Sequence, residues 1–225
     1  MTSPPYFLYH GYCEDYLPLV PAGSVRAVIT DPPYGMEYRS NHRPDAAKFD
    51  KIVGDEGVPV EWMRECRRLI RPDGCLLTFC HWKTAEAFRQ ALQGAGWTVT
   101  NQAVWDRGWD GMGDLGRMMG PIYDLIWFCA EPGFRWPGKR PSALFRHMRL
   151  SGTVLQHPTQ KPLALMKELV GYLTAPGDTV LDPYAGSGST GVAAVQMGRR
   201  FLGCEVVEDY WRLADTRLRR AAERR

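Results

Sequence analysis

The sequence predicts a single α/β domain, and three observations lead to this fold class. Short apolar runs of strand length alternate with longer amphipathic runs of helix length. The length of 225 residues suits one large domain or two small ones. No internal repeat or low-complexity tract interrupts the pattern, so we expect one domain over residues 1–225, with long functional segments between its elements.

Strands are predicted where apolar and β-branched residues form short runs, and helices where apolar residues recur at helical spacing. The predicted strands are 25–30, 75–80, 98–105, 123–129, 179–181 and 201–206. The predicted helices are 60–70, 83–94, 162–174, 189–197 and 210–222. Pro162 suits the first turn of its helix, because the N–H that proline lacks is not needed there.

Composition argues against a membrane protein and against a secreted disulfide scaffold. No segment approaches the roughly 18 consecutive apolar residues of a membrane span. The N-terminus also lacks the basic-then-apolar layout of a secretory signal. Six scattered cysteines form no Cys-x-x-Cys pair and have no histidine at ligand spacing, and most of them lie in or beside apolar runs. We therefore expect a cytoplasmic protein that has no metal site and does not contact a membrane.

Positive charge is concentrated in two segments, although the formal net charge is only +3. Residues 211–225 carry six arginines against two acids, and residues 133–149 carry five cations and no acid. Such segments bind polyanions or are simply solvated surface, and charge alone leaves both interpretations open.

A glycine loop over residues 179–191 connects a predicted strand to a predicted helix, and its glycines spell G-x-G-x-x-G. Glu205 ends the next predicted strand, which is the layout of a nucleotide-binding site with an acid for ribose hydroxyls. A P-loop is excluded because no lysine follows the glycines. Asp182 at the strand tip would repel a pyrophosphate but suits the ammonium group of S-adenosylmethionine (SAM). A nicotinamide-dependent oxidoreductase remains the alternative.

The tetrad Asp31-Pro32-Pro33-Tyr34 follows the predicted strand 25–30 directly. It offers a carboxylate, carbonyls in a stiff proline turn and an aromatic face at the end of a strand, where α/β sheets place ligands. Methylation of an exocyclic base amine needs this set. The lone pair of the amine is delocalised into the ring, and two acceptors for its hydrogens make the nitrogen more nucleophilic. Tyr34 would stack on a base that is swung out of the duplex.

Together with the run His157-Pro-Thr-Gln-Lys-Pro162, the tetrad and the glycine loop resemble the motifs of SAM-dependent DNA amino-methyltransferases of the N4-cytosine/N6-adenine family. The order of the motifs resembles the permuted (β) class, in which the tetrad precedes the SAM loop. The resemblance covers roughly residues 11–217. It implies a Rossmann-like fold with a twisted, mostly parallel, seven-stranded sheet flanked by helices, in which one strand is antiparallel.

The resemblance also implies an activity. An aspartate at the first tetrad position is more typical of adenine enzymes, so we expect methyl transfer from SAM to N6 of adenine in duplex DNA by base flipping, with S-adenosylhomocysteine as the product. Cytosine N4 is the alternative target. A protein that binds SAM and DNA without activity also stays open. Double-stranded DNA is the expected partner, and the resemblance allows a homodimer and a cognate restriction enzyme in a bacterial or phage-encoded system.

Site residues follow from the resemblance, position by position. The catalytic residues would be Asp31, Pro32, Pro33 and Tyr34. The SAM contacts would be Cys13, Asp31, Thr159, Lys161, Asp182, Pro183, Ala185, Gly186, Ser187, Gly188 and Glu205. Within this set, Lys161 would bind the SAM carboxylate and Glu205 the ribose. Family members commonly read Gly-Asp-Cys where this chain has Gly11-Tyr12-Cys13, so the polar contact to the SAM adenine is missing or replaced by stacking.

Two segments are expected to handle the DNA. Residues 35–57 adjoin Tyr34 and would form a flap over the flipped base. Residues 107–156 would form an insertion that recognises the target. The cations expected to contact phosphates and bases there are Arg135, Lys139, Arg140, Arg146 and Arg149.

Overall fold

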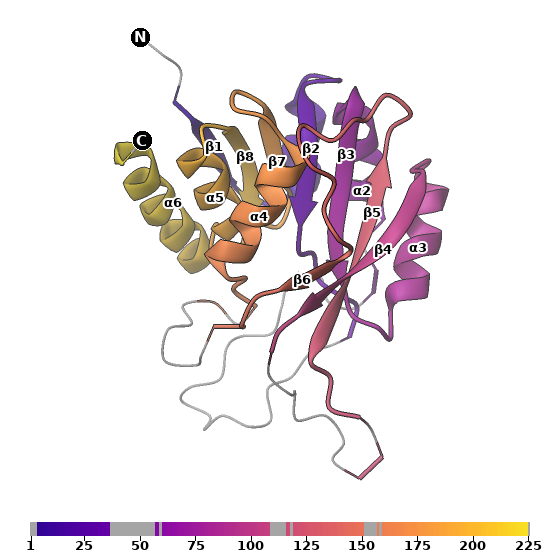
Figure 1. Cartoon of the computed structure of the whole chain (residues 1–225). Helices are drawn as coiled ribbons and strands as arrows, with labels where there is room; N and C mark the ends of the chain where they lie inside the picture. Colours follow the sequence, from indigo (N-terminus) through magenta and orange to yellow (C-terminus); the bar gives the residue numbers. More distant parts are fainter. Residues whose placement is uncertain are drawn as a thin grey trace.

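The computed structural model describes residues 4–36, 57–58, 60–108, 116–117, 119–150, 157 and 159–224. In these ranges eight strands form one sheet in the order β1-β8-β7-β2-β3-β5-β4-β6 (Figure 1). The strands are β1 (Tyr6–His10), β2 (Val25–Thr30), β3 (Ile70–Cys80), β4 (Val99–Asp106), β5 (Tyr123–Ala130), β6 (Leu144–Arg146), β7 (Thr179–Asp182) and β8 (Arg200–Glu205). The helices are α1 (Cys13–Tyr16), η1 (Leu17–Leu19), α2 (Glu61–Leu69), α3 (Ala85–Gly94), α4 (Leu163–Leu173), α5 (Ser189–Gln196) and α6 (Glu208–Glu223).

The sheet is mostly parallel, which confirms the predicted fold class. Only β5 runs against its neighbours β3 and β4, and all other adjacent pairs among the described strands are parallel. The expected count of seven strands becomes eight because the three-residue β6 adds to the edge beyond β4. β2, β3 and β7 therefore end at the same edge of the sheet, which we call the catalytic edge (the lower edge in Figure 1).

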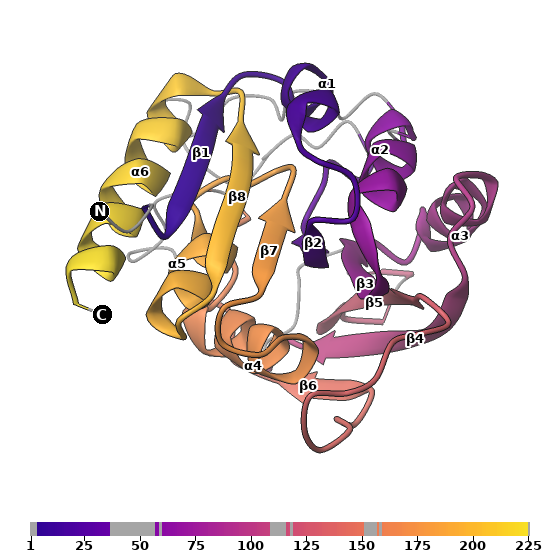
Figure 2. The ribbon, with the colours of Figure 1, turned by 90° about the horizontal axis from the view of Figure 1, so that it is seen from above.

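Two apolar cores hold the layers together, one on each face of the sheet. Figure 2 shows α4, α5 and α6 on one face and α1, α2 and α3 on the other. Ile29 of β2 belongs to the first core and the adjacent Val28 to the second, because successive side chains of a strand point to opposite faces. Both residues are fully buried, so β2 lies at the centre of the fold and its end is positioned rigidly.

All predicted strands and helices are present, with small differences at their ends. β5 lies inside the range 107–156 that the sequence assigns to a target-recognition insertion, yet it is a central strand between β3 and β4. An insertion can therefore lie only in the segments that flank β5. All six cysteines are buried free thiols, which confirms the prediction for the four in or beside apolar runs, Cys75, Cys80, Cys129 and Cys204. Within the described ranges, no helix is long and apolar enough to cross a bilayer.

Candidate active site

The tetrad and the glycine loop meet at the catalytic edge. Asp31 follows the last residue of β2, and Asp182 is the last residue of the neighbouring strand β7. The hydroxyl of Thr30 donates a hydrogen bond of 2.7 Å to Oδ1 of Asp182, and both side chains are buried. Pro32 and Pro33 are buried as well. The structure thus brings together the two motifs that the sequence singles out.

The carboxylate of Asp31 is held by two donors. The hydroxyl of Tyr34 donates to Oδ1 at 2.5 Å, and the ammonium of Lys161 donates to Oδ2. The side chain of Asp31 is 16% exposed and that of Lys161 is 8% exposed. Sequence similarity assigns Lys161 to the carboxylate of SAM, whereas in this structure its ion-pair partner is Asp31.

Aromatic rings surround this ion pair. The Lys161 ammonium lies 4.7 Å from the ring centroid of Phe79 and 5.8 Å from that of Trp105. The ring of Tyr34 packs edge-to-face on Phe88 at a centroid distance of 6.5 Å. Burial raises the pKa of Tyr34 well above its usual value, so its hydroxyl stays a donor to Asp31 at neutral pH. Stacking of Tyr34 on a base remains a prediction.

A second buried carboxylate lies beside this group, and the sequence analysis missed it. Asp124 is near the start of β5, and Arg107 Nη1 lies 3.4 Å from its Oδ1. Burial raises the pKa of Asp124, while the charges of Lys161 and Arg107 act in the opposite direction. An acid inside the apolar run 123–130 is the sequence signal that could have revealed it.

The glycine loop is shaped by backbone that only glycine adopts easily. Gly186 has φ +51° and Gly188 has φ +75°. Glu205 at the end of β8 accepts hydrogen bonds from the N–H of Gly186 (2.8 Å) and of Val207 (2.9 Å). Its carboxylate thereby ties the loop to β8, and burial raises the pKa of Glu205. The lone pairs of this carboxylate that the backbone donors leave free are the ones a ribose could use.

Asp182 is a buried hydrogen-bond acceptor at the start of the glycine loop. It is 2% exposed and accepts hydrogen bonds from Thr30 and from the N–H of Tyr184 (3.1 Å). Burial raises the pKa of Asp182 to about 6. The geometry therefore supports a role in positioning the loop, which differs from the expected direct contact with the SAM ammonium.

The run 157–162 connects the loop to the tetrad. The ring of His157 lies 3.2 Å from the point that a Cβ on Gly186 would occupy, and it packs edge-to-face on Tyr210 with 4.2 Å between centroids. Burial lowers the pKa of His157 to about 4, so the ring is neutral at pH 7. Thr159 donates its backbone N–H to Nδ1 of His157 at 3.3 Å. His157 therefore covers the glycine loop, and Lys161 of the same run contacts Asp31.

The N-terminal segment that departs from the family pattern also ends at this edge. The N–H of Gly11 donates to the carbonyl oxygen of Glu205 at 3.0 Å. Tyr12 follows, and 55% of it is exposed, whereas Cys13 is buried at the start of α1. The exposed ring of Tyr12 is compatible with stacking on an adenine, and the role of Cys13 stays a prediction.

The cations expected to contact DNA lie at two different ends of the sheet. The carbonyl oxygen of Arg135 accepts a hydrogen bond of 3.0 Å from Arg26, near the start of β2, about 16 Å along the strand from Asp31. Arg146 of β6 pairs at 3.8 Å with Asp106, the last residue of β4, and the N–H of Arg149 donates to the carbonyl oxygen of Arg107. The catalytic edge therefore holds Arg146 and Arg149 but not Arg135.

The remaining expectations concern two surface cations, the flap and the absence of a metal site. Lys139 and Arg140 are exposed in the segment between β5 and β6. Most of the proposed flap, residues 37–56, lies outside the described residues. Within the part of the chain that the structure describes, no three His, Cys, Asp or Glu side chains gather as a candidate metal site.

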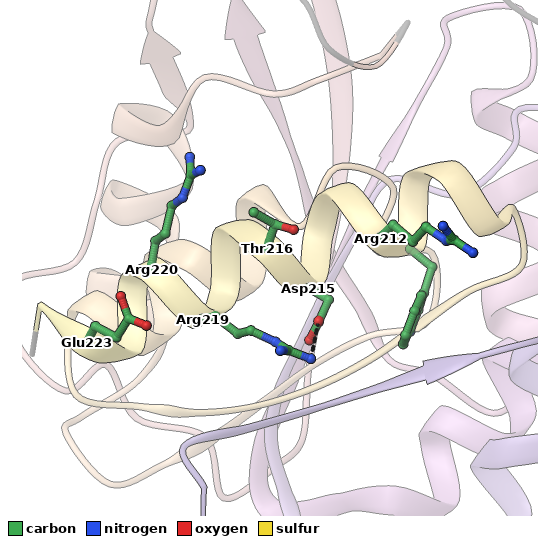
Figure 3. Close-up of a pocket in the computed structure, with 7 residues that line it drawn as sticks. Arg212, Asp215, Thr216, Arg219, Arg220 and Glu223 are labelled. Carbon is green, nitrogen blue, oxygen red and sulfur yellow. Dashed lines mark ion pairs between the residues drawn. The ribbon is translucent and has the colours of Figure 1, made fainter.

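The basic C-terminal helix carries a pocket on its outer face (Figure 3). Its lining residues are Trp211, Arg212, Asp215, Thr216, Arg219, Arg220 and Glu223. Arg219 pairs with Asp215 at 2.8 Å, and Arg212 pairs with Glu208 at 2.5 Å, so acids of the same helix neutralise these two arginines. The pocket is separate from the tetrad and the glycine loop, and a role for the tail in DNA binding stays a prediction.

Known proteins are similar to this chain in sequence and in fold. Residues 25–216 match the model of the N6/N4 methyltransferase family, whose description is DNA methylase. YubD of Escherichia coli (strain K12) is 31% identical over 212 residues, which is 92% of this chain and 88% of YubD. The DNA adenine methyltransferase YhdJ of the same organism is 27% identical over 256 residues, covering 93% of this chain and 81% of YhdJ. The crystal structure of the M1.HpyAVI–SAM complex has a TM-score of 0.71 at 26% identity, covering 95% of this chain and all of that chain.

Proposed function

Because the chain belongs to the DNA methylase family of N6 and N4 methyltransferases, we propose that it transfers a methyl group from SAM to the N6 amine of adenine in double-stranded DNA. One observation carries this proposal. The carboxylate of Asp31, oriented by Tyr34 and Lys161, lies at the same edge as the glycine loop, and the bond from Thr30 to Asp182 joins the two. An amine acceptor and a nucleoside-binding loop are thus parts of one site.

The residues at this edge fit SAM. A Cβ on Gly186 would lie 3.2 Å from His157, and one on Gly188 would lie 3.0 Å from Ala214, so the loop keeps its shape only with bare backbone. Such backbone lets a ligand approach closely. The exposed ring of Tyr12 and the carboxylate of Glu205 suit an adenine and a ribose. When bound, SAM supplies an electrophilic methyl group on its sulfonium.

We assign the SAM-holding role to residues at the catalytic edge. They are Cys13, Asp31, Thr159, Pro183, Ala185, Gly186, Ser187, Gly188 and Glu205, with Asp182 supporting the loop from below. Lys161 was expected on the SAM carboxylate, but its pairing with Asp31 supports a different role, which is argued in the next subsection.

The chemistry of the tetrad follows from hydrogen-bond acceptors fixed in advance. A carboxylate offers about four lone-pair sites, of which Tyr34 and Lys161 use two at Asp31. The remaining sites can accept one N–H of the target amine, and the Pro32 carbonyl can accept the other. With both hydrogens bound, the nitrogen lone pair is less delocalised into the ring. The same acceptors stabilise the positive charge that develops on the amine during transfer.

Recognition of the duplex would involve base flipping and contacts to the phosphates. The target base must leave the stack, which costs a few kcal/mol, and residues 35–57 would close over it. The segments that flank β5 would recognise the sequence around it, with Arg146 and Arg149 on the phosphates near Asp31. The permuted class, a homodimer and a restriction enzyme partner remain predictions.

The choice of adenine over cytosine rests on Asp31 at the first tetrad position and on the relative YhdJ, which is named a DNA adenine methyltransferase. Both targets present an exocyclic amine, so the same residues could serve cytosine N4. Base identity therefore needs a direct chemical test.

The decisive experiment incubates the protein with labelled SAM and mixed-sequence duplex DNA and then digests the DNA to nucleosides. We expect labelled N6-methyladenine. Labelled N4-methylcytosine would reassign the base but keep the chemistry. Binding of SAM in calorimetry without any labelled nucleoside would indicate an inactive binding protein, and binding of NAD in place of SAM would overturn the proposal.

A further inference from the structure

Lys161 acts on two carboxylates from two different strands. Its ammonium donates to Asp31 after β2, and its positive charge also favours the ionised form of Asp124 of β5. Asp124 and Trp105 are directly opposite each other on β5 and β4, so their side chains share one face of the sheet. The Lys161 ammonium lies over that same Trp105 ring. All three charged groups therefore occupy one face at the catalytic edge.

The charges in this group alternate in sign. Arg107 lies 3.4 Å from Asp124, Lys161 acts on both Asp124 and Asp31, and Asp31 ends the series where the target amine is expected. Lys161 and Asp124 are each 8% exposed. In such a poorly solvated place, charges interact more strongly than in water, so each one depends on its neighbours.

Removal of the central cation has a definite electrostatic consequence. Asp31 and Asp124 carry like charges, and the charge of Asp31 disfavours the ionised form of Asp124. Without Lys161, Asp31 would lose its poorly solvated ion-pair partner while Asp124 kept its negative charge, and the protonated form of Asp31 would be favoured. A protonated Asp31 is a poorer acceptor for an N–H hydrogen, so methyl transfer would fail even with SAM in place.

We propose that Lys161 is a positioning residue for methyl transfer, which holds Asp31 ionised and aimed at the target amine against the second carboxylate, Asp124. This inference rests on the proposed function, because it assigns Asp31 to the amine. It also makes Asp124 part of the same device. Asp124 balances the charge of Lys161, which would otherwise oppose the positive charge that develops on the amine.

The groups that face this cluster from neighbouring elements do not replace Lys161. They are Tyr34 of the tetrad, Cys80 and His81 at the end of β3, Arg107 after β4, His157 before α4 and Asp182 of β7. Burial lowers the pKa of His81 and of His157, and it raises the pKa of Tyr34 and of Cys80, so these four are neutral at pH 7. Asp182 adds only negative charge. Among the described residues, Arg107 is the other lysine or arginine that acts on Asp124, which it approaches to 3.4 Å.

The test compares Lys161→Met, Asp124→Asn and the double variant, with SAM affinity from calorimetry and kcat from labelled methyl transfer. We expect Lys161→Met to lower kcat by about tenfold or more at pH 7 while SAM affinity changes by less than about threefold. Its kcat should recover as the pH is raised, because the higher pH removes the proton from Asp31 in this variant. Asp124→Asn should lower kcat through the excess of positive charge.

The double variant is the sharpest test, because it removes one charge of each sign and leaves the net charge of the cluster unchanged. We expect its loss of kcat to be smaller than the product of the two single losses by about threefold or more. Lys161→Arg, which keeps the charge, should retain more activity than Lys161→Gln; this pair also serves if the methionine variant fails to fold. The inference would be overturned if the kcat losses of the two single variants multiplied in the double variant. It would also be overturned if weaker SAM binding explained the whole loss of activity in Lys161→Met, because Lys161 would then bind the SAM carboxylate.

A second measurement needs neither SAM nor DNA. Acylation by an amine-reactive reagent, followed by mass spectrometry, should label Lys161 slowly in the wild type and several times faster in Asp31→Asn. The exposed Lys83 is the control, and its labelling should not change. Equal labelling of Lys161 in both proteins would refute the ion pair. If the wild type labels as expected but transfers no methyl group to DNA, the proposed function fails and the ion pair stands.

Discussion

Thr30 donates a hydrogen bond of 2.7 Å to the carboxylate of Asp182, and this bond joins two motifs that lie 152 residues apart in the sequence. β2 and β7 are adjacent parallel strands, so Thr30 and Asp182 occupy the same edge. The tetrad Asp31-Pro32-Pro33-Tyr34 follows Thr30 directly, and the glycine loop continues from Asp182. A shift of one strand against the other would therefore change the distance between target and cofactor, and this bond resists such a shift.

Thr30→Val tests the contribution of this bond. The substitution keeps the shape of the side chain but leaves a buried carboxylate oxygen with one donor fewer. We expect the free energy of unfolding to fall by about 1–3 kcal/mol, and SAM affinity to fall with it as the loop loses support. Urea denaturation and calorimetry measure the two effects.

Thr78→Val provides a matched control for that variant. Thr78 is buried, it is the register partner of Thr30 on β3, and its hydroxyl donates to a carbonyl oxygen at 3.2 Å. We expect a smaller loss of stability and no change in SAM affinity. Equal effects of the two valines on SAM binding would remove the special role of the bond to Asp182.

Asp182 makes stability depend on pH in a definite direction. Its pKa rises from 3.8 to about 6 on folding, so between about pH 4 and pH 6 the folded state keeps a proton that the unfolded state has lost. The wild type should therefore lose stability as the pH rises through this window, by about 3 kcal/mol from this group.

Asp182→Asn should remove this dependence, because asparagine does not titrate and can still accept from Thr30. The difference in unfolding free energy between wild type and variant, followed from pH 4 to pH 7, isolates the contribution of Asp182 from those of other acids. A constant difference across that range would show that Asp182 does not titrate there.

The sequence predicted the strands, the helices and both motifs, because apolar periodicity and the order of short motifs are local properties. It missed β1 and β6, which are short and lack a clear pattern. It also missed Asp124 and the pairing of Lys161 with Asp31, because these contacts depend on which strands are neighbours in the sheet. The sequence shows that segment 133–149 is positively charged. It could not show that this segment extends from one end of the sheet to the other.

Gly188→Ala tests whether the loop requires bare backbone. Its φ of +75° is unfavourable for alanine, and a Cβ would lie 3.0 Å from that of Ala214. We expect a loss of about 1–3 kcal/mol in unfolding free energy together with weaker SAM binding. Gly96→Ala is the control, since Gly96 has φ +87° but no atom within 4 Å of the added Cβ. If Gly188→Ala lowers the free energy of unfolding no more than Gly96→Ala does, the contact of the added Cβ with α6 does not contribute to the loss.

Substitutions in the tetrad should lower the rate of methyl transfer but leave SAM binding intact. Asp31→Ala should abolish methyl transfer while SAM binding survives, because the variant loses the acceptor for the target amine. Tyr34→Phe keeps the ring against Phe88 and removes only the hydroxyl that orients Asp31, so we expect an intermediate loss of kcat. Single-turnover transfer to duplex DNA and calorimetry with SAM measure the two properties. Transfer by Asp31→Ala at a rate comparable to the wild type would show that the catalytic assignment is wrong.

The placement of the arginines predicts an asymmetric effect on DNA binding. Arg146 and Arg149 are exposed near the catalytic edge, whereas Arg135 is exposed at the opposite end of β2. A duplex that delivers a base to Asp31 can contact the first two but not the third. Replacement of both Arg146 and Arg149 by glutamine should weaken binding and reduce the slope of log affinity against log salt by about 2. Arg135→Gln, which removes one positive charge, should leave the slope unchanged. A salt slope that falls by about 1 in Arg135→Gln would mean that the duplex crosses a different face of the protein.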